Sequence, residues 1–157
     1  MNLIIHIIGL PGTGKSTIAK KISNQTGFPI ISTEEVRADI YSEDKVEADK
    51  DFSKKELKIT YEEVLKIAKE NLELNKSIIV EGVYRNRKQR KAIINLAKEY
   101  SYGIIGFYIT AEEKEILKRL EKRKKKGTRS PAGVEAYFKI KKEFAKPLKS
   151  YLTINNS

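Results

Sequence analysis

The chain has 157 residues, with 32 Lys and Arg against 21 Asp and Glu and a formal net charge of +11. This length predicts one domain, residues 1–157, with a workable core. The absence of cysteine excludes disulfides and thiolate metal sites. No apolar run approaches membrane-spanning length, and the first apolar run follows Met1 directly, so we expect a cytoplasmic protein without a signal peptide or membrane partner. The basic excess favours anionic partners, although most lysines are expected on solvated helix faces.

An apolar run, Leu3–Ile8, opens the chain and predicts a buried strand. The next eight residues, 9–16, fit the pattern G-x-x-x-x-G-K-[ST], and an amphipathic segment that begins at Thr17 and ends near Gly27 follows them. A strand, a glycine-rich loop and a helix in this order are the context of a phosphate-binding loop. His6, inside the apolar run, is expected to be a core residue with a satisfied hydrogen bond.

Each residue type in the loop serves phosphate binding. Glycines let successive N–H groups converge on phosphate oxygens, at a helix N-terminus whose dipole favours anions. We expect Lys15 to bind the β- and γ-phosphates of ATP and the Ser16 hydroxyl to bind Mg²⁺. The loop residues expected to bind the nucleotide are Gly9, Pro11, Gly12, Thr13, Gly14, Lys15, Ser16 and Thr17.

Strand and helix patterns alternate along the rest of the chain. Further strands are expected at residues 29–32, 77–81, 102–109 and 150–155. Helices are expected at residues 34–40, 53–72, 87–100, 111–121 and 130–147. Two capping boxes, Ser53 with Glu56 and Thr110 with Glu113, are expected to open two of these helices. The basic run 122–129 is expected to interrupt the helical pattern.

This alternation predicts an α/β fold with a parallel sheet covered by helices on both faces. Ligands of such sheets bind at the carboxyl ends of the strands. That rule brings the segments that contain Glu34, Arg37, Glu81 and Arg85 to the same rim as the phosphate-binding loop.

Three further motifs carry a resemblance to a known family. Thr33–Arg37 supplies a carboxylate and, three positions later, an arginine; Glu81–Arg90 follows the third strand; and Arg119 and Arg123 precede a Gly-Thr pair. With these motifs the chain resembles the small P-loop kinases, the group that includes the bacteriophage polynucleotide kinase domain and the gluconate-type and zeta-toxin-type kinases.

The resemblance implies a three-layer α/β/α fold, a five-stranded sheet in the order 2-3-1-4-5, and the use of ATP and Mg²⁺. It also implies a helical lid at about 122–133 and a substrate-side segment at about 34–56.

Site roles follow from the chemistry and the resemblance together. Glu34 is expected to be the base that accepts a hydroxyl proton, with Glu35 as a competitor. Glu81 would hold Mg²⁺ with Ser16, and Arg123 would stabilise the transferred phosphoryl group, which makes Lys15, Glu34 and Arg123 the catalytic set. The remaining expected roles are nucleotide binding by Arg119, Arg123 and Arg129, and substrate binding by Glu34, Arg37, Arg85 and Arg90.

The leading hypothesis is a kinase that transfers the γ-phosphoryl group of ATP to a hydroxyl of a small metabolite or nucleoside. One alternative is a polynucleotide 5′-hydroxyl kinase, which the basic lid favours. A nucleotide-binding ATPase or switch is less favoured, because the chain lacks the Asn-Lys-x-Asp and Asp-x-x-Gly motifs of GTP switches in the required places. A non-catalytic nucleic-acid-binding module would leave the phosphate-binding loop unexplained. The acceptor and the oligomeric state stay open.

Overall fold

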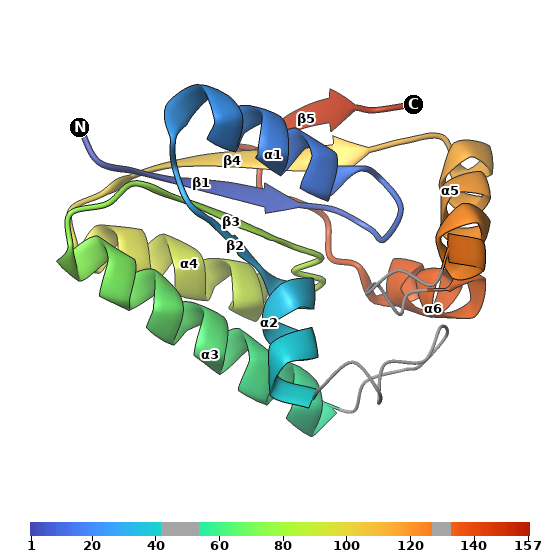
Figure 1. Cartoon of the computed structure of the whole chain (residues 1–157), viewed down its shortest axis with the longest axis horizontal. Helices are drawn as coiled ribbons and strands as arrows, with labels where there is room; N and C mark the ends of the chain where they lie inside the picture. The colour runs from blue at the N-terminus through green and yellow to red at the C-terminus, as the bar shows by residue number, and fades with distance from the viewer. Residues whose placement is uncertain (42–53, 127–132) are drawn as a thin grey trace.

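A parallel β-sheet forms the centre of the computed structural model, which describes residues 1–41, 54–126 and 133–157. In these residues the sheet has five strands in the order β2-β3-β1-β4-β5, which confirms the predicted order. All four neighbouring pairs are parallel, so the carboxyl ends of the strands share one edge (Figure 1). The strands are β1 (Leu3–Ile8), β2 (Ile30–Ser32), β3 (Ile78–Gly82), β4 (Gly103–Thr110) and β5 (Leu152–Asn155).

Helices cover both faces of this sheet, as the sequence predicts. Figure 1 shows α1 over one face, α3 and α4 over the other, and α5 and α6 beyond the carboxyl ends of β1 and β4. The helices are α1 (Lys15–Thr26), α2 (Thr33–Tyr41), α3 (Lys54–Glu73), α4 (Arg87–Glu99), α5 (Glu113–Lys126) and α6 (Val134–Glu143). The three-layer α/β/α architecture is therefore confirmed.

The central strand β1 explains why the sheet has two cores. Ile4 and Ile8 point into a cluster formed with α3 and α4, whereas Ile5 and Ile7 pack in a second cluster with Ala19 of α1. Alternate residues of a strand face opposite sides, so a strand covered on both faces must be apolar throughout. Each fully buried isoleucine contributes about 1.5–3 kcal/mol to folding. This pattern holds the end of β1, and the loop that follows it, in a rigid position.

A third, smaller cluster joins α5 to α6. Ile116 and Leu120 of α5 are buried against Tyr137 of α6. The Tyr137 hydroxyl donates a hydrogen bond of 3.2 Å to Glu113, and Lys141 forms an ion pair of 2.7 Å with the same carboxylate. The two helices beyond the rim therefore have a small core of their own.

Two local predictions about this region are wrong. Thr110 does not cap α5: it is the last residue of β4, where its hydroxyl donates to the Ile154 carbonyl, and the Glu113 carboxylate bonds to α6 instead. The helix also continues through the basic run to Lys126. Basic side chains at a helix C-terminus interact favourably with the helix dipole, so the charges do not end the helix there.

Candidate active site

The loop between β1 and α1 has the backbone of an anion cradle. Gly12 and Gly14 have φ angles of 83° and 91°, which residues with a Cβ rarely adopt, and Gly14 is the N-cap of α1. The Thr13 hydroxyl and the Lys15 ammonium both donate hydrogen bonds of 2.9 Å to the Leu10 carbonyl. The free N–H groups of the first turn of α1 therefore face the space in front of the loop, where the helix dipole favours an anion.

Two residues from the far end of the sequence brace this loop. The Asn156 side-chain amide donates a hydrogen bond of 2.9 Å to the Thr13 carbonyl. Arg119 of α5 donates to the Gly12 carbonyl at 3.3 Å and to the Asn156 carbonyl at 2.6 Å, and forms an ion pair of 3.4 Å with Glu115. Sequence reasoning missed Asn156, because nothing in its local sequence marks a residue 143 positions from its partner as part of the site.

A basic pocket of about 430 Å³ opens beside the loop, between α1 and α5. Its cationic side chains come from successive turns of α5 and the loop lies opposite them. The lining residues are Gly14, Thr17, Arg119, Lys122, Arg123, Lys126 and Asn156. The predicted nucleotide-binding residues Arg119 and Arg123 are thus brought to the phosphate-binding loop. Lys122 and Lys126, expected to be merely solvated, line the same pocket.

The carboxylates predicted for metal and proton chemistry lie close to Lys15. Burial lowers the pKa of the Lys15 ammonium, which is only 6 % exposed, and the nearby charges of Glu81 and Glu34 oppose that effect. Burial likewise raises the pKa of Glu81, while Lys15 and a hydrogen bond from Ser32 favour its charged form. The fold therefore gathers two carboxylates and a buried ammonium from β3, α2 and α1.

The sequence offered both Glu34 and Glu35 as the candidate base. Adjacent residues of a helix point in different directions, and this distinguishes the two side chains. Glu34 is half-buried and its charge acts on both Lys15 and Glu81, whereas Glu35 is exposed and its charge acts on Glu81 with a smaller effect. Both lie in the first turn of α2, directly after the carboxyl end of β2. This geometry favours Glu34 over Glu35 as a group that can reach a bound substrate.

Arginines predicted to bind the acceptor lie around Glu34. Arg37 is half-buried on α2; burial lowers its pKa, and the charges of Glu34 and Arg85 also act on it. Arg85 forms an ion pair of 3.3 Å with Glu143 at the end of α6. Tyr61 of α3 accepts a hydrogen bond from the Tyr84 backbone N–H in the same region. Side chains from α2, α3 and the loop after β3 therefore form one polar region around Arg37.

Arg90 does not belong to that space, so its predicted role in substrate binding is not carried forward. It is only 2 % exposed, and its guanidinium donates to the carbonyls of Tyr84, Ala145 and Lys146 at 2.7, 2.8 and 3.2 Å. It also stacks over the Phe144 ring, 4.7 Å from its centroid. Arg90 ties the segment after α6 to the loop after β3, and these bonds occupy the donors that a substrate phosphate would need.

His6 is a core residue, as expected. Its Nδ1 lies 2.6 Å from the Tyr151 hydroxyl, and its ring meets the Tyr84 ring edge-on at 4.3 Å. Burial lowers the pKa of His6 to about 3, so the imidazole is neutral at physiological pH. Tyr84 itself has a φ of 48°, held by the hydrogen bond to Tyr61 and by Arg90. The loop that carries Arg85 is therefore held in place by buried aromatic side chains that pack against one another.

Some predicted features lie outside the described residues. These are Arg129, half of the proposed lid at 122–133, the middle of the substrate-side segment 34–56, and Ser53 of the first capping box. Among the described helices, none combines the length and the apolar character that a membrane span requires.

Comparison with known proteins agrees with this geometry. The AAA_33 family (AAA domain) matches residues 4–147. An adenylate kinase from Azobacteroides pseudotrichonymphae is 33 % identical over 141 residues, which cover 85 % of this chain and 73 % of that protein. Three other adenylate kinases are matched over 57–66 % of their lengths.

Two solved structures share the fold. A sugar kinase from Janibacter superposes with a TM-score of 0.74 and 13 % identity, over 99 % of this chain and 84 % of that chain. The APS kinase CysC of Mycobacterium tuberculosis, in complex with AMPPNP and APS, superposes with a TM-score of 0.67 and 14 % identity, over 98 % and 88 %. With the glycine cradle, the buried Lys15 and the match to the family over most of its length, the chain belongs to the AAA_33 family of P-loop kinase domains.

Proposed function

We propose that the protein transfers the γ-phosphoryl group of ATP to a hydroxyl of a small acceptor. The observation that carries this proposal is the position of Glu34 beside Lys15 and Glu81. A hydroxyl must lose a proton as it attacks phosphorus, and a carboxylate at this place can accept it. A phosphate acceptor is already anionic, needs no base, and would be repelled by Glu34.

ATP binding follows from the loop and the pocket beside it. The phosphates would lie on the N–H groups of the cradle, where Lys15 can exchange the Leu10 carbonyl for phosphate oxygens. The rest of the nucleotide would occupy the pocket that Gly14 and Arg119 line. The family membership and the AMPPNP complex of the APS kinase support a triphosphate in this position.

A magnesium ion fits the groups available at the loop. Ser16 is half-buried at the start of α1, and Glu81 is buried and interacts with Lys15, the residue before Ser16, so these two residues would hold the ion, Glu81 through water. Among the described residues no group of three or more acidic or histidine side chains forms a metal cage. Mg²⁺ in phosphoryl-transfer sites usually has one or two protein ligands plus phosphates and water, and it neutralises the developing charge.

The side chains of the site would then have separate roles in the transfer. Glu34 takes the proton of the acceptor hydroxyl, whose oxygen bonds to the γ-phosphorus as the bond to the ADP oxygen breaks. Lys15 and Arg123 stabilise charge on the equatorial oxygens. Arg37 and Arg85 orient an anionic group of the acceptor.

A phosphate acceptor is the second candidate, because the curated relative that matches this chain over 73 % of its own length is an adenylate kinase. In that case Arg37 and Arg85 would bind the accepting phosphate itself. Glu34 would then be dispensable for the chemical step.

Phosphoryl transfer from ATP labelled in the γ-phosphate tests both candidates. The acceptor panel contains sugars, nucleosides and 5′-hydroxyl oligonucleotides as hydroxyl acceptors, and nucleoside monophosphates as phosphate acceptors. Lys15→Ala is the control for contaminating kinases, with its fold checked by thermal melting. Labelled product from a hydroxyl acceptor, lost in Glu34→Gln, supports the proposal. Product from monophosphates alone, unchanged in Glu34→Gln, establishes the second candidate.

A further inference from the structure

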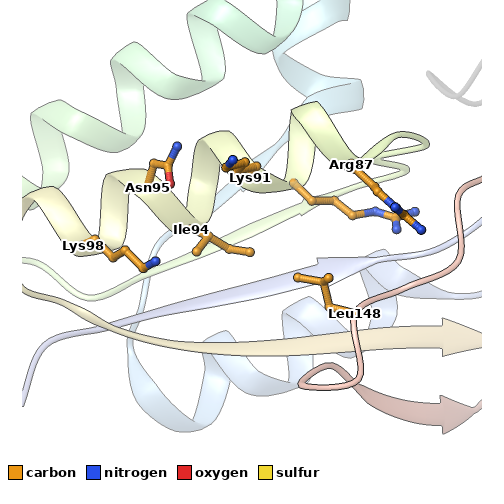
Figure 2. Close-up of a pocket in the computed structure, with 7 residues that line it drawn as sticks. Arg87, Lys91, Ile94, Asn95, Lys98 and Leu148 are labelled. Carbon is orange, nitrogen blue, oxygen red and sulfur yellow. The ribbon is translucent and has the colours of Figure 1, made fainter.

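A second basic groove lies on the outer side of α4, away from the phosphate-binding loop. It has a volume of about 320 Å³ and lies between α4 and the segment that precedes β5. Figure 2 shows Arg87, Lys91 and Lys98 on successive turns of α4, with Ile94 between them and Leu148 facing the helix. None of the roles described for the kinase site uses these residues, apart from the structural Arg90 in the wall.

The charge of the groove is of one sign. Its described lining residues include four cations and no acidic side chain. Residues 87–98 of α4 include five basic residues and no acidic one, and the helix ends at the acidic Glu99. The segment that faces it, residues 144–149, adds Lys146 and Lys149, both exposed. Cations so placed repel one another, and a polyanion relieves that repulsion while releasing its own counterions.

The groove also has an apolar floor. Ile94 is half-buried and Leu148 is 45 % exposed, although it is a large aliphatic side chain at the surface. A simple anion such as phosphate would gain nothing from this floor. A ligand that joins negative charges to flat apolar groups would use both features.

The cations are arranged in a line rather than around a point. Arg87 and Lys98 are eleven residues apart on one helix, about 16 Å at 1.5 Å per residue. A stacked single strand of nucleic acid rises about 3.4 Å per nucleotide, so this line spans roughly five nucleotides. That length falls within the range of about 4–16 nucleotides that single-strand-binding folds cover.

We propose that this α4 groove, lined by Arg87, Lys91, Ile94, Lys98 and Leu148, binds single-stranded nucleic acid. The phosphates lie along the cationic side chains of α4, and one base lies on Ile94 and Leu148. A duplex presents its bases to its own partner strand and leaves the apolar floor unused. An acidic protein helix would match the charge, but the narrow apolar floor offers two side chains where such a helix usually presents a longer apolar stripe.

The groove joins the kinase site at one end. Arg87 is the first residue of α4, two positions after Arg85 on the acceptor side. Arg90 lines the groove and also bonds to the Tyr84 carbonyl beneath that side. A strand in the groove therefore leads toward the acceptor rim. Binding in the groove does not depend on the proposed phosphoryl transfer, so the two can fail separately.

Fluorescence anisotropy with a labelled oligothymidine of about fifteen nucleotides tests the proposal, with ADP and Mg²⁺ present to occupy the phosphate-binding loop. Lys91→Gln combined with Lys98→Gln should weaken binding about tenfold at low salt and reduce the slope of log K against log salt by about 1.4. Leu148→Asp should weaken binding of the single strand more than binding of inorganic polyphosphate.

The matched control removes the same charge from the opposite face of the sheet. Lys20→Gln combined with Lys21→Gln lies on exposed positions of α1 and should change affinity less than twofold. If both double variants lost the same amount of affinity, the binding would depend only on the net charge of the protein, and the proposal would be overturned. Absence of binding by the folded, unmodified protein, or equal binding of duplex and single strand, would also overturn it. Circular dichroism of each variant verifies the fold.

Discussion

The proposed nucleotide side and the proposed acceptor side of this rim are built in different ways. On the nucleotide side, backbone groups of one continuous segment form the cradle, and Asn156 and Arg119 hold that backbone through its carbonyls. On the acceptor side, side chains from α2, α3 and the loop after β3 meet around Glu34 and Arg37. One side depends on backbone conformation, the other on which side chains converge.

This difference explains why the two sides can differ in how many kinds of ligand they bind. A backbone cradle binds any polyphosphate tail in the same way, so it suits a cosubstrate common to many kinases. A space enclosed by side chains changes with each substitution, so it suits an acceptor that differs from one relative to the next.

The largest expected effect comes from Arg123. It lines the pocket beside Gly14 and its charge reaches Lys15. Arg123→Ala should lower kcat by about 10³–10⁵ while nucleotide affinity changes little, because an arginine of this kind acts on transition-state charge. Single-turnover transfer and nucleotide titration measure the two quantities. Lys125→Ala, on an exposed turn of the same helix, should be near normal; an equal loss there would contradict the role.

The second prediction is that Glu34→Gln impairs catalysis on the acceptor side and leaves nucleotide binding unchanged. We expect kcat for a hydroxyl acceptor to fall by about 10²–10⁴, because the amide cannot take the proton. ATP affinity should be unchanged, since the cradle does not use this side chain. Glu35→Gln is the matched control on the exposed side of α2 and should retain activity. If the two variants behave alike, Glu34 is not the base.

The third prediction concerns His6, a buried residue of the central strand β1 that supports both sides of the rim. It tests how the stability of the protein depends on pH. The pKa of His6 is about 3 in the folded protein and about 6.5 when unfolded, so between these values only the unfolded state binds the proton. The free energy of unfolding should fall by about 1.4 kcal/mol per pH unit as the pH drops below 6.5. Urea unfolding at pH 6 and pH 5 measures this slope. His6→Phe should be less stable at neutral pH, but its free energy of unfolding should depend less on pH between pH 6 and pH 5. The same slope in the variant and the unmodified protein would contradict this prediction.

Asn156→Ala gives the smallest effect and tests the nucleotide side. The variant loses one hydrogen bond to the Thr13 carbonyl, worth about 0.5–1.5 kcal/mol, so ATP affinity should weaken about two- to tenfold. The KM for the acceptor should stay within twofold if the two sides are independent. Thr153→Ala, on an exposed position of β5, controls for general loosening of the edge strand. A larger change in acceptor KM than in ATP affinity would contradict the division.

The sequence by itself determined the strands, most of the helices and the phosphate-binding loop, because these depend on local patterns, whereas the order of the strands was implied by the resemblance to the small P-loop kinases. Alternating apolar runs specify strands and helices, and the glycines specify the φ angles of the cradle. Residues that act through neighbours in the chain, such as Lys15 and Gly14, could be assigned from their spacing alone. Their functional roles stay predictions, as does the choice of acceptor.

Only the tertiary structure decided which distant side chains meet. Asn156 contacts Thr13 although it is 143 residues away, and Arg90, which the sequence predicted as a substrate-binding residue, is buried on three carbonyls. Thr110 has the spacing of a helix cap but belongs to a strand, because pairing with β5 competes for it. Hydrogen bonds across the fold are set by packing rather than by sequence spacing, so the sequence could identify the nucleotide side almost completely and the acceptor side only in part.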